Sequence, residues 1–274
     1  MRVHYRTLAI ALIAIACAKD APPQSDSVAQ IGNATVDEQW VPELGPLLAV
    51  PGDSDNTAIL LSPASTEETG SVALMRTAGD SSATSRISPT DLQVCGEVPT
   101  ARLASAGPAG WTVALAPGVT ALRADSIESL ASADSSALAA DIARIGSAVA
   151  NDSGSRFAGL PFAVIAAHRL TMDSSTIVIA RVMRRIPQEA TPLEERTLVI
   201  GEQQRGEPFV LKYSKRSSGA EDVIDHHLFL AAVRAGKKHF VLLVSEREGS
   251  ARYEILERSG SGSWRPRWWR MLSC

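Results

Sequence analysis

Residues 162–186 read FAVIAAHRLTMDSSTIVIARVMRRI. Two runs of apolar and β-branched residues, 162–172 and 176–186, flank the short polar segment Asp173-Ser174-Ser175. Runs of this kind on either side of a turn segment are typical of a β-hairpin with long strands. Because the two strands of a hairpin are antiparallel, this stretch predicts that the C-terminal half of the chain is built on an antiparallel sheet.

The same alternation of strands and turns extends in both directions from this hairpin. A second hairpin is predicted from the runs 196–202 and 208–214, which flank Gln204-Arg205-Gly206. Three last strands are predicted at 239–246, 252–258 and 264–271. Shorter strands, separated by turn residues such as Gly, Pro and Asp, are predicted in the N-terminal part at 46–50, 57–61, 71–77, 92–98 and 111–116.

Two segments favour helices. Within 126–150 the apolar residues follow helical spacing, and the polar segment 132–136 is a point where this helix could divide. The segment 220–235 reads as an amphipathic helix, with Glu221 and Asp222 in a first turn, where the helix dipole favours acids, and Gly236 as its stop. The predicted fold class is therefore α+β and β-dominated. It has antiparallel meander strands in one or two sheets, a central helix at about 126–150 and a C-terminal helix at about 220–235.

The chain starts with the segment MRVHYRTLAIALIAIAC, residues 1–17. Two basic residues, Arg2 and Arg6, precede an apolar run that is too short to span a bilayer as a helix, and this order is typical of a secretory signal peptide. Its end, Ala14-Ile15-Ala16-Cys17, resembles the lipobox of bacterial lipoproteins, in which the cysteine becomes the lipidated N-terminus. The segment departs from that pattern at Ala14, where leucine is usual.

This resemblance covers residues 1–17 alone and implies export with lipidation of Cys17. The residue after the cysteine is Ala18 and not aspartate, which by the same resemblance implies sorting to the outer membrane. Plain secretion, with cleavage after a small residue near Ala16, is the alternative, and a cytoplasmic location is the least favoured. The predicted organisation is a signal peptide at 1–16, a lipid-anchored, disordered tether at 17–38 and one globular unit at 39–274. That unit could contain sub-units at 39–120 and 157–274, bridged by helix 126–150.

Charge and cysteine content narrow the class of protein. The chain of 274 residues has a formal net charge of −3, which argues against a nucleic-acid partner because such binding requires cationic neutralisation of phosphates. If lipidation consumes Cys17, Cys95 and Cys274 remain in an oxidising compartment, and we predict a disulfide between them. Two unpaired thiols are the alternative.

The sequence carries no H-E-x-x-H helix, phosphate-binding loop, G-x-S-x-G elbow or dinucleotide-binding glycine pattern. The residues that could ligate a metal gather at Asp222, Asp225, His226 and His227. On a helix, Asp222 and His226 would face the same way, but two ligands do not make a metal site, and a third would have to come from a distant residue such as His168 or His239. A solvated helix face with capping acids is the simpler interpretation, and neither a metal nor a cofactor is predicted.

The last strand carries an aromatic and basic segment, WRPRWWR, residues 264–270. Ideal strand alternation would place Trp264 and Trp268 on one face and Arg265, Arg267 and Trp269 on the other. These five residues form a candidate binding face, for stacking of sugars, for contact with the membrane interface or for binding of phosphates and carboxylates. The alternative is that the tryptophans close the core and that arginines stack on Trp269.

These observations predict a non-catalytic lipoprotein of the cell envelope, a binding or assembly module more readily than an enzyme. Its expected partners are the membrane, through the lipid anchor, and another envelope protein or a glycan. The alternative is an envelope hydrolase or a metal-dependent enzyme with a site near His226 and His227.

Overall fold

The computed structural model describes residues 39–54, 56–63, 69–94, 98–150, 155–188, 191–221, 223–260 and 262–273. In this part of the chain the strands form a closed six-stranded barrel and two five-stranded sheets, and all strand pairs are antiparallel. The β-dominated, antiparallel fold class predicted from the sequence is confirmed. Cys95, Cys274 and Asp222 lie outside the described residues, so the predicted disulfide and the metal-ligand candidate Asp222 stay predictions.

The barrel is formed by the N-terminal strands in the order β1-β2-β5-β4-β3-β6, after a 3-10 helix, η1 (Pro42–Leu44). Its strands are β1 (Leu48–Pro51), β2 (Thr57–Leu60), β3 (Gly70–Met75), β4 (Ser81–Val94), β5 (Val98–Leu103) and β6 (Val113–Leu115). Its interior is closed by small and aliphatic side chains, among them the fully buried Ala49, Leu60, Leu74 and Ala114. Pairing of β1 with β6 closes the ring, so the barrel has no free sheet edge.

The two open sheets are built mainly from the C-terminal half. The outer sheet has the order β12-β11-β10-β9-β8 and the inner sheet the order β16-β15-β14-β13-β7. The outer strands are β8 (Ala124–Ser126), β9 (Ala163–Met172), β10 (Ser175–Ile186), β11 (Leu193–Gln203) and β12 (Val210–Ala220). The inner strands are β7 (Val119–Leu122), β13 (His226–Ala235), β14 (Lys238–Arg247), β15 (Ser250–Arg258) and β16 (Trp264–Ser273).

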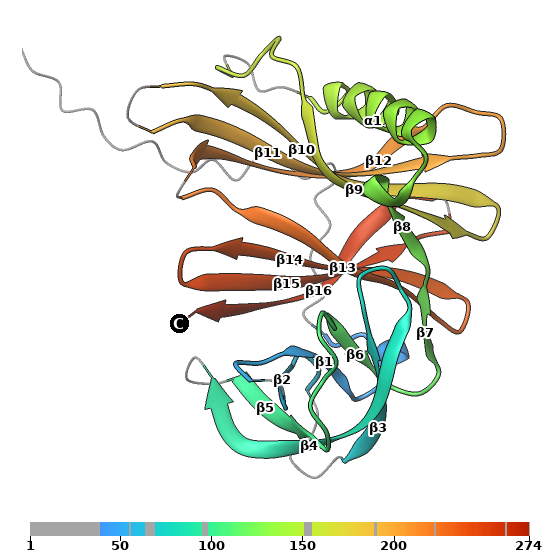
Figure 1. Ribbon diagram of the computed structural model, residues 1–274, viewed down its shortest axis with the longest axis vertical. Helices are drawn as coiled ribbons and strands as arrows, with labels where there is room; N and C mark the ends of the chain where they lie inside the picture. Colours follow the sequence, from blue (N-terminus) through green and yellow to red (C-terminus); the bar gives the residue numbers. More distant parts are fainter. Residues whose placement is uncertain are drawn as a thin grey trace, which may run out of the picture.

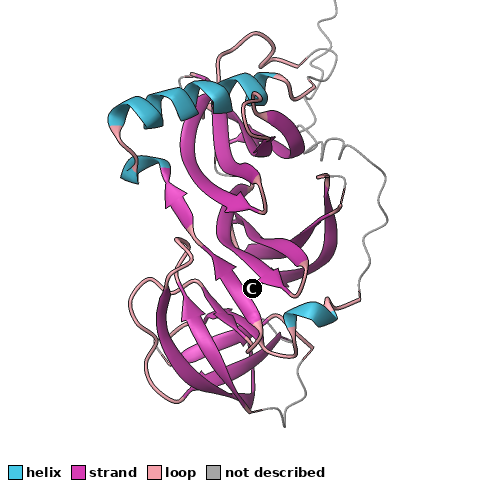
Figure 2. Cartoon of the chain, turned by 90° about the vertical axis from the view of Figure 1, so that its right-hand side faces the viewer, coloured by secondary structure: helices cyan, strands magenta, loops and turns pink. Residues whose placement is uncertain are grey.

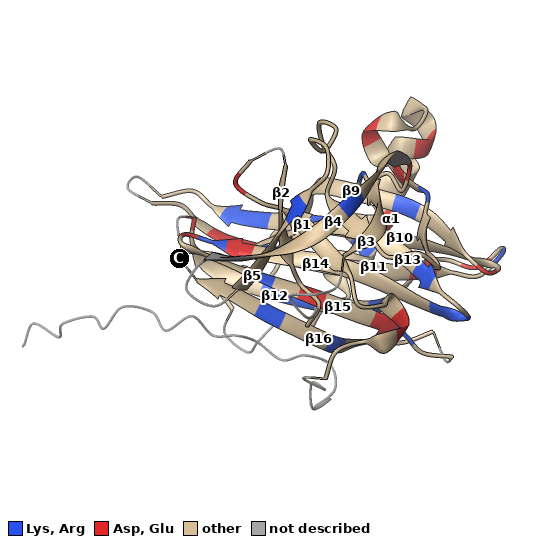
Figure 3. Cartoon of the chain, turned by 90° about the horizontal axis from the view of Figure 1, so that it is seen from below, with Lys and Arg blue, Asp and Glu red and all other residues tan. Residues whose placement is uncertain are grey.

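The units stack as layers (Figure 1; Figure 2): helix α1 (Ser132–Ser147), the outer sheet, the inner sheet and then the barrel. Leu138, Ile142 and Ile145 of α1 pack on the outer sheet. The inner sheet is covered on both faces, since one core cluster joins it to the outer sheet and another joins it to the barrel. Lysine and arginine are interspersed with aspartate and glutamate on the strands (Figure 3).

The chain passes from the barrel through the inner to the outer sheet between β7 and β8, with Arg123 between them. Gly79, in the turn after β3, packs against this crossover, and the Ala124 amide donates to the Ala78 carbonyl at 2.8 Å. A Cβ on Gly79 would lie 2.1 Å from the Leu122 carbonyl oxygen, and its φ of +82° also favours glycine. The close approach of the two backbones therefore requires this glycine.

The hairpin over 162–186 is confirmed as β9 and β10, and the second hairpin as β11 and β12. Asp173 has a φ of +53° in the turn between β9 and β10, a conformation that aspartate tolerates better than most residues. The last three predicted strands are confirmed as β14, β15 and β16.

The predicted C-terminal helix at 220–235 is wrong, because this segment contains the end of β12, a turn and strand β13. Two features obscured the strand pattern. Both faces of β13 are covered, which removes the apolar–polar alternation, and a β-bulge between Phe229 and Ala231 shifts the register by one residue. The resulting spacing of apolar residues imitates a helix.

The predicted helical region 126–150 contains a 3-10 helix, η2 (Ile127–Ser129), and then α1. The Ser126 hydroxyl accepts a hydrogen bond from the Glu128 amide and caps η2. Within the described residues, no helix is long and apolar enough to cross a membrane.

Candidate functional site

The space between the outer and inner sheets is filled unevenly. Its middle is an apolar core that includes Ile177, Ile200, Val241 and Leu256. Two networks of buried polar side chains, called here clamps, connect the sheets: one centres on Arg258 at one end, and the other on Lys215 along one side. At the other end, around the end of β10 and the start of β13, the space opens into a pocket with charged walls. The open end of the inter-sheet space is therefore the candidate site.

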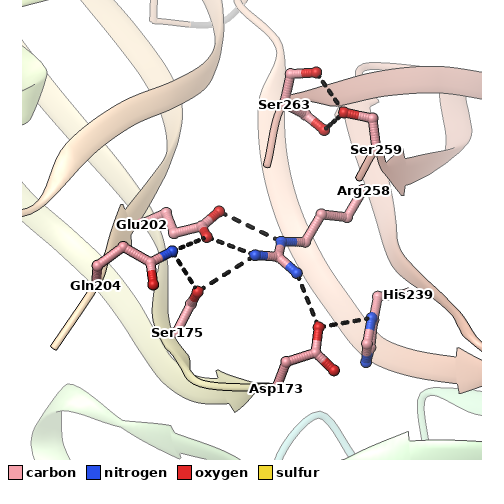
Figure 4. Close-up of polar contacts among 8 residues, drawn as sticks. All are labelled: Asp173, Ser175, Glu202, Gln204, His239, Arg258, Ser259 and Ser263. Atoms are coloured by element: carbon pink, nitrogen blue, oxygen red, sulfur yellow. Dashed lines mark hydrogen bonds and ion pairs between the residues drawn. The ribbon is translucent and has the colours of Figure 1, made fainter. Parts of the chain in front are cut away.

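The first clamp centres on Arg258 at the end of β15 (Figure 4). Its guanidinium donates to Glu202 of β11 at 2.5 Å, to Asp173 at 3.1 Å and to the Ser175 hydroxyl at 3.3 Å. His239 lies 3.9 Å from Asp173, on the far side of that carboxylate from Ser175. Because the serine and the histidine are not adjacent, these residues form an inter-sheet ion-pair network and no nucleophile–base pair.

The second clamp joins β12 to the inner sheet. Lys215 donates to the fully buried Glu254 at 2.5 Å and to the Ser245 hydroxyl at 3.1 Å. Ser245 is also 2.8 Å from Nδ1 of His227, which is 3% exposed. The clamp therefore fixes the orientation of the His227 ring at the edge of the charged pocket.

The charged pocket, called here the cationic pocket, has a volume of about 300 Å³. Its polar walls are Arg181 and Arg185 of β10, Glu194, Arg196 and Thr197 of β11, Glu221, and His226 and His227 of β13. Ile165 and Met183 add apolar surface. Ala166 of β9 faces the inner sheet, so regular alternation would turn its neighbour Ile165 away from the pocket. Ile165 reaches the pocket because it is the extra residue of a β-bulge opposite Arg181 and Val182.

The three arginines of the pocket differ in their partners. Arg196 contacts Glu194 at 2.6 Å and also touches the His226 ring. Arg185 lies 3.6 Å from Glu194 and 3.3 Å from Glu221. The Arg181 guanidinium has no hydrogen bond or ion pair with any residue that the structure describes, although Arg181 is only partly exposed. The pocket wall therefore contains two carboxylates and three guanidinium groups, and Arg181 is the guanidinium without a carboxylate partner among the described residues.

Burial and neighbouring cations set the protonation states. Burial lowers the pKa of Arg181, and the positive charge of Arg196 lowers it further. Burial also lowers the pKa of His226, with Arg196 and Arg181 acting in the same direction. For His227, burial followed by the charge of Lys215 lowers the pKa to about 3. Both histidines are therefore neutral near pH 7, and the arginines carry the positive charge of the pocket.

One buried polar atom at the pocket has no hydrogen-bond partner among the described residues: Nε2 of His227, a residue that is 3% exposed. Thr197 pairs with Val182 on the face that packs against α1, so its unpartnered Oγ1 lies on the other side of the outer sheet. Buried polar groups almost always have a partner, so Nε2 of His227 marks a place where water or a ligand completes the structure.

A second cavity of about 330 Å³ shares Arg181 with the cationic pocket. It is mainly apolar, with Ile179, Leu198 and Phe229 among its walls, and Nδ1 of His168 lacks a hydrogen-bond partner there. Leu230, the bulged residue of β13, lines it and accepts a hydrogen bond at its carbonyl from the Thr112 hydroxyl of the barrel at 3.2 Å. Arg181 thus lies at the boundary between a polar and an apolar compartment.

A larger groove of about 620 Å³ lies between α1 and the β8–β9 edge of the outer sheet. Asp125 and Asp141 in its wall are paired with Arg123 at 3.3 Å and Arg144 at 3.0 Å. These pairs involve side chains that are 39–88% exposed, where water solvates the charges. Arg169 in its wall is also partly exposed and has no side-chain partner among the described residues, but none of the buried unpartnered polar atoms belongs to a residue of this groove.

The structure separates the residues of the predicted binding face. The prediction that Trp264 and Trp268 share a face of β16 is wrong, because a bulge opposite Ile255 and Leu256 reverses the alternation. Trp264 packs between the two sheets, and Trp268 packs toward the barrel, edge-on to Trp40 at 5.3 Å.

The basic residues of the same face already have partners. Arg265 and Arg267 both bind the buried carboxylate of Glu257, at 3.0 and 2.5 Å. Although burial alone would raise the pKa of Glu257, these hydrogen bonds lower it overall. Trp269 lies under the guanidinium of Arg252 at 4.5 Å. Binding of a partner by this strand stays a prediction.

The predicted ligand candidates His226 and His227 both line the cationic pocket, whereas His168 lies in the apolar cavity and His239 at the Arg258 clamp. Among the described residues, no group of three or more His, Cys, Asp or Glu could hold a metal ion. The sequence reasoning missed Arg181. Its signal was a lone arginine within the apolar run TIVIARV, 176–182.

No family model, curated protein or solved structure matches this chain.

Proposed function

We propose that this protein is a non-catalytic binding module of the bacterial cell envelope, exported and held at the outer membrane by a lipid on Cys17. The signal-like segment 1–17 supports the location, and the tether at 17–38 would give the globular unit reach from the membrane. The module receives a small ligand in the cationic pocket. Another envelope protein or a glycan remains the proposed macromolecular partner.

The observation that carries the binding function is the pocket's unused donors. Among the described residues, Arg181 is an unpaired, partly buried guanidinium, and Nε2 of the buried His227 also lacks a partner. Leaving a buried polar group unpaired costs about 1–3 kcal/mol, which a bound ligand can recover. Ligand sites are typically preformed concave pockets with a few polar groups that fix orientation, and this pocket has that character.

The alternative function is an envelope hydrolase or a metal-dependent enzyme near His226 and His227. The Ser245–His227 contact of 2.8 Å supports the hydrolase, since a nucleophilic serine requires an adjacent base. Two observations favour binding. Ser245 is buried and does not line the cationic pocket, and a histidine with a pKa of about 3 is a weak base at neutral pH.

The test combines location with active-site labelling. The full chain and its Cys17→Ser variant would be expressed in a bacterial host, the membranes separated, and the extracts treated with a fluorophosphonate probe for reactive serines. We expect the wild-type chain in the outer-membrane fraction, the Cys17→Ser variant outside it, and no labelling. Labelling that disappears in a Ser245→Ala variant would establish the hydrolase instead. Equal fractionation of both proteins would refute the lipid anchor.

A further inference from the structure

His227 supplies a hydrogen-bond donor in the wall of the cationic pocket. Nδ1 of His227 lies 2.8 Å from the Ser245 hydroxyl, which accepts a hydrogen bond from Lys215 at 3.1 Å. The Ser245 proton has no other acceptor among the described residues, so it is donated to Nδ1. The neutral ring then carries its own proton on Nε2, the atom that lacks a partner. His227 therefore presents a donor at the pocket wall.

The charges of the pocket define the sign and number of charges on a ligand. Glu194 and Glu221 balance Arg196 and Arg185, and Arg181 remains with one positive charge. The negative charge of Glu246 acts to raise the pKa of Arg181, but Glu246 forms no ion pair with it and does not line the pocket. One anionic group would balance this charge, and a planar guanidinium is suited to bind a carboxylate or a phosphate oxygen pair.

The apolar surface defines the rest of the ligand. Ile165 and Met183 line the cationic pocket itself, and the second cavity, with Ile179 and Phe229, begins at Arg181. A ligand with its charge at Arg181 would therefore meet apolar side chains in both directions.

Resting on the proposed binding function, we propose that the pocket takes a small amphipathic monoanion, with its anionic group bound by Arg181 and Nε2–H of His227. Its short apolar body packs on Ile165 and Met183 or extends toward Phe229. The pocket thus selects for one negative charge joined to an apolar chain.

The experiment titrates hexanoate, hexan-1-ol and hexylamine, which differ in charge and share one chain length. Isothermal titration calorimetry is performed on the full chain in lipid nanodiscs, and empty nanodiscs give the blank for partition into lipid. We expect hexanoate to bind at least tenfold more tightly than the other two. Arg181→Met should weaken hexanoate binding tenfold or more, and Arg181→Lys should weaken it less. His227→Gln, which retains a donor near the position of Nε2, should bind better than His227→Leu.

Arg169→Met is the matched control, because Arg169 is a partly exposed arginine of the neighbouring strand β9 on the opposite face of the sheet. It should leave binding unchanged, and circular dichroism of each variant verifies folding. Equal affinity for hexanoate and hexan-1-ol, or unchanged binding by Arg181→Met, would overturn the anion assignment. Binding of the alcohol or the amine that Ile165→Trp blocks would preserve the binding function and refute the ligand class. Failure of all three probes to bind would overturn both proposals.

Discussion

Replacing Arg258 with methionine should reveal what the Arg258 clamp contributes to stability. The side chains of Arg258 and Glu202 are 13% and 3% exposed, and the guanidinium is the carboxylate's cationic partner. Methionine would leave Glu202 as a buried charge with only the Gln204 amide as a described side-chain donor, at 3.1 Å. Breaking a buried pair in this way typically costs about 3–5 kcal/mol. We expect Arg258→Met to lower the free energy of unfolding by about that amount.

Two further variants test whether the loss of stability comes from the uncompensated charge of Glu202. If the cost comes from the uncompensated charge, Glu202→Gln in the Arg258→Met background should recover a large part of it, because the amide is neutral and of similar shape. Arg247→Met is the matched control. Arg247 pairs with Asp225 at 2.9 Å, but both side chains are at least 30% exposed, so its loss should cost no more than about 1 kcal/mol.

The assay is equilibrium urea unfolding, followed by tryptophan fluorescence and circular dichroism so that separate unfolding of the barrel would be detected. A loss of stability in Arg258→Met no larger than in Arg247→Met would refute the reasoning. Failure of the double variant to recover stability would show that packing, rather than charge, accounts for the loss.

Three other predictions concern single residues. Burial holds the pKa of His227 near 3, against about 6.5 in the unfolded chain, so the unfolded state binds more protons below pH 6.5. The free energy of unfolding should therefore fall by on the order of 4 kcal/mol from this group as the pH is lowered from 6.5 toward 3. Urea titrations across that range should show a weaker fall for His227→Gln. Gly79→Ala should lower the unfolding free energy by at least about 2 kcal/mol, because its Cβ would collide with the crossover backbone; an unchanged melting temperature would contradict this. Gly201→Ala should cost about 1–3 kcal/mol, since its Cβ would lie 2.7 Å from a side chain of α1, whereas Gly260→Ala, with open space, should stay within about 0.5 kcal/mol in the same denaturation assay.

Local sequence patterns predicted the hairpins of the outer sheet because their information lies in neighbouring residues. The turn at Asp173 and the apolar runs on each side specify β9 and β10 without reference to distant parts of the chain. The barrel strands were located less well. Strand β4 (Ser81–Val94) was expected only over its end, at 92–98, because its start is rich in serine and threonine and gives no apolar pattern.

The failures at β13 and β16 have a common physical cause. A β-bulge shifts each strand by one residue, and the sequence does not mark either position. In β16 this shift sends Trp264 and Trp268 to opposite faces, so a face drawn from ideal alternation does not exist.

Residue type alone drew attention to His226 and His227, and the structure places both at the pocket. The decisive partner, Arg181, is distant in sequence and meets them only because the two sheets stack at that point. Whether an arginine has an ion-pair partner depends on three-dimensional packing, which local patterns do not encode.

The most direct test of the central claim is native mass spectrometry of the protein extracted from its own membrane with mild detergent. The account predicts a chain that begins at Cys17 with acyl groups and carries a small molecule of one negative charge, which an Arg181→Met variant loses and an Arg169→Met variant keeps. An unlipidated chain without any bound small molecule, identical in mass behaviour to the Arg181→Met variant, would contradict the proposal of an anchored binding module.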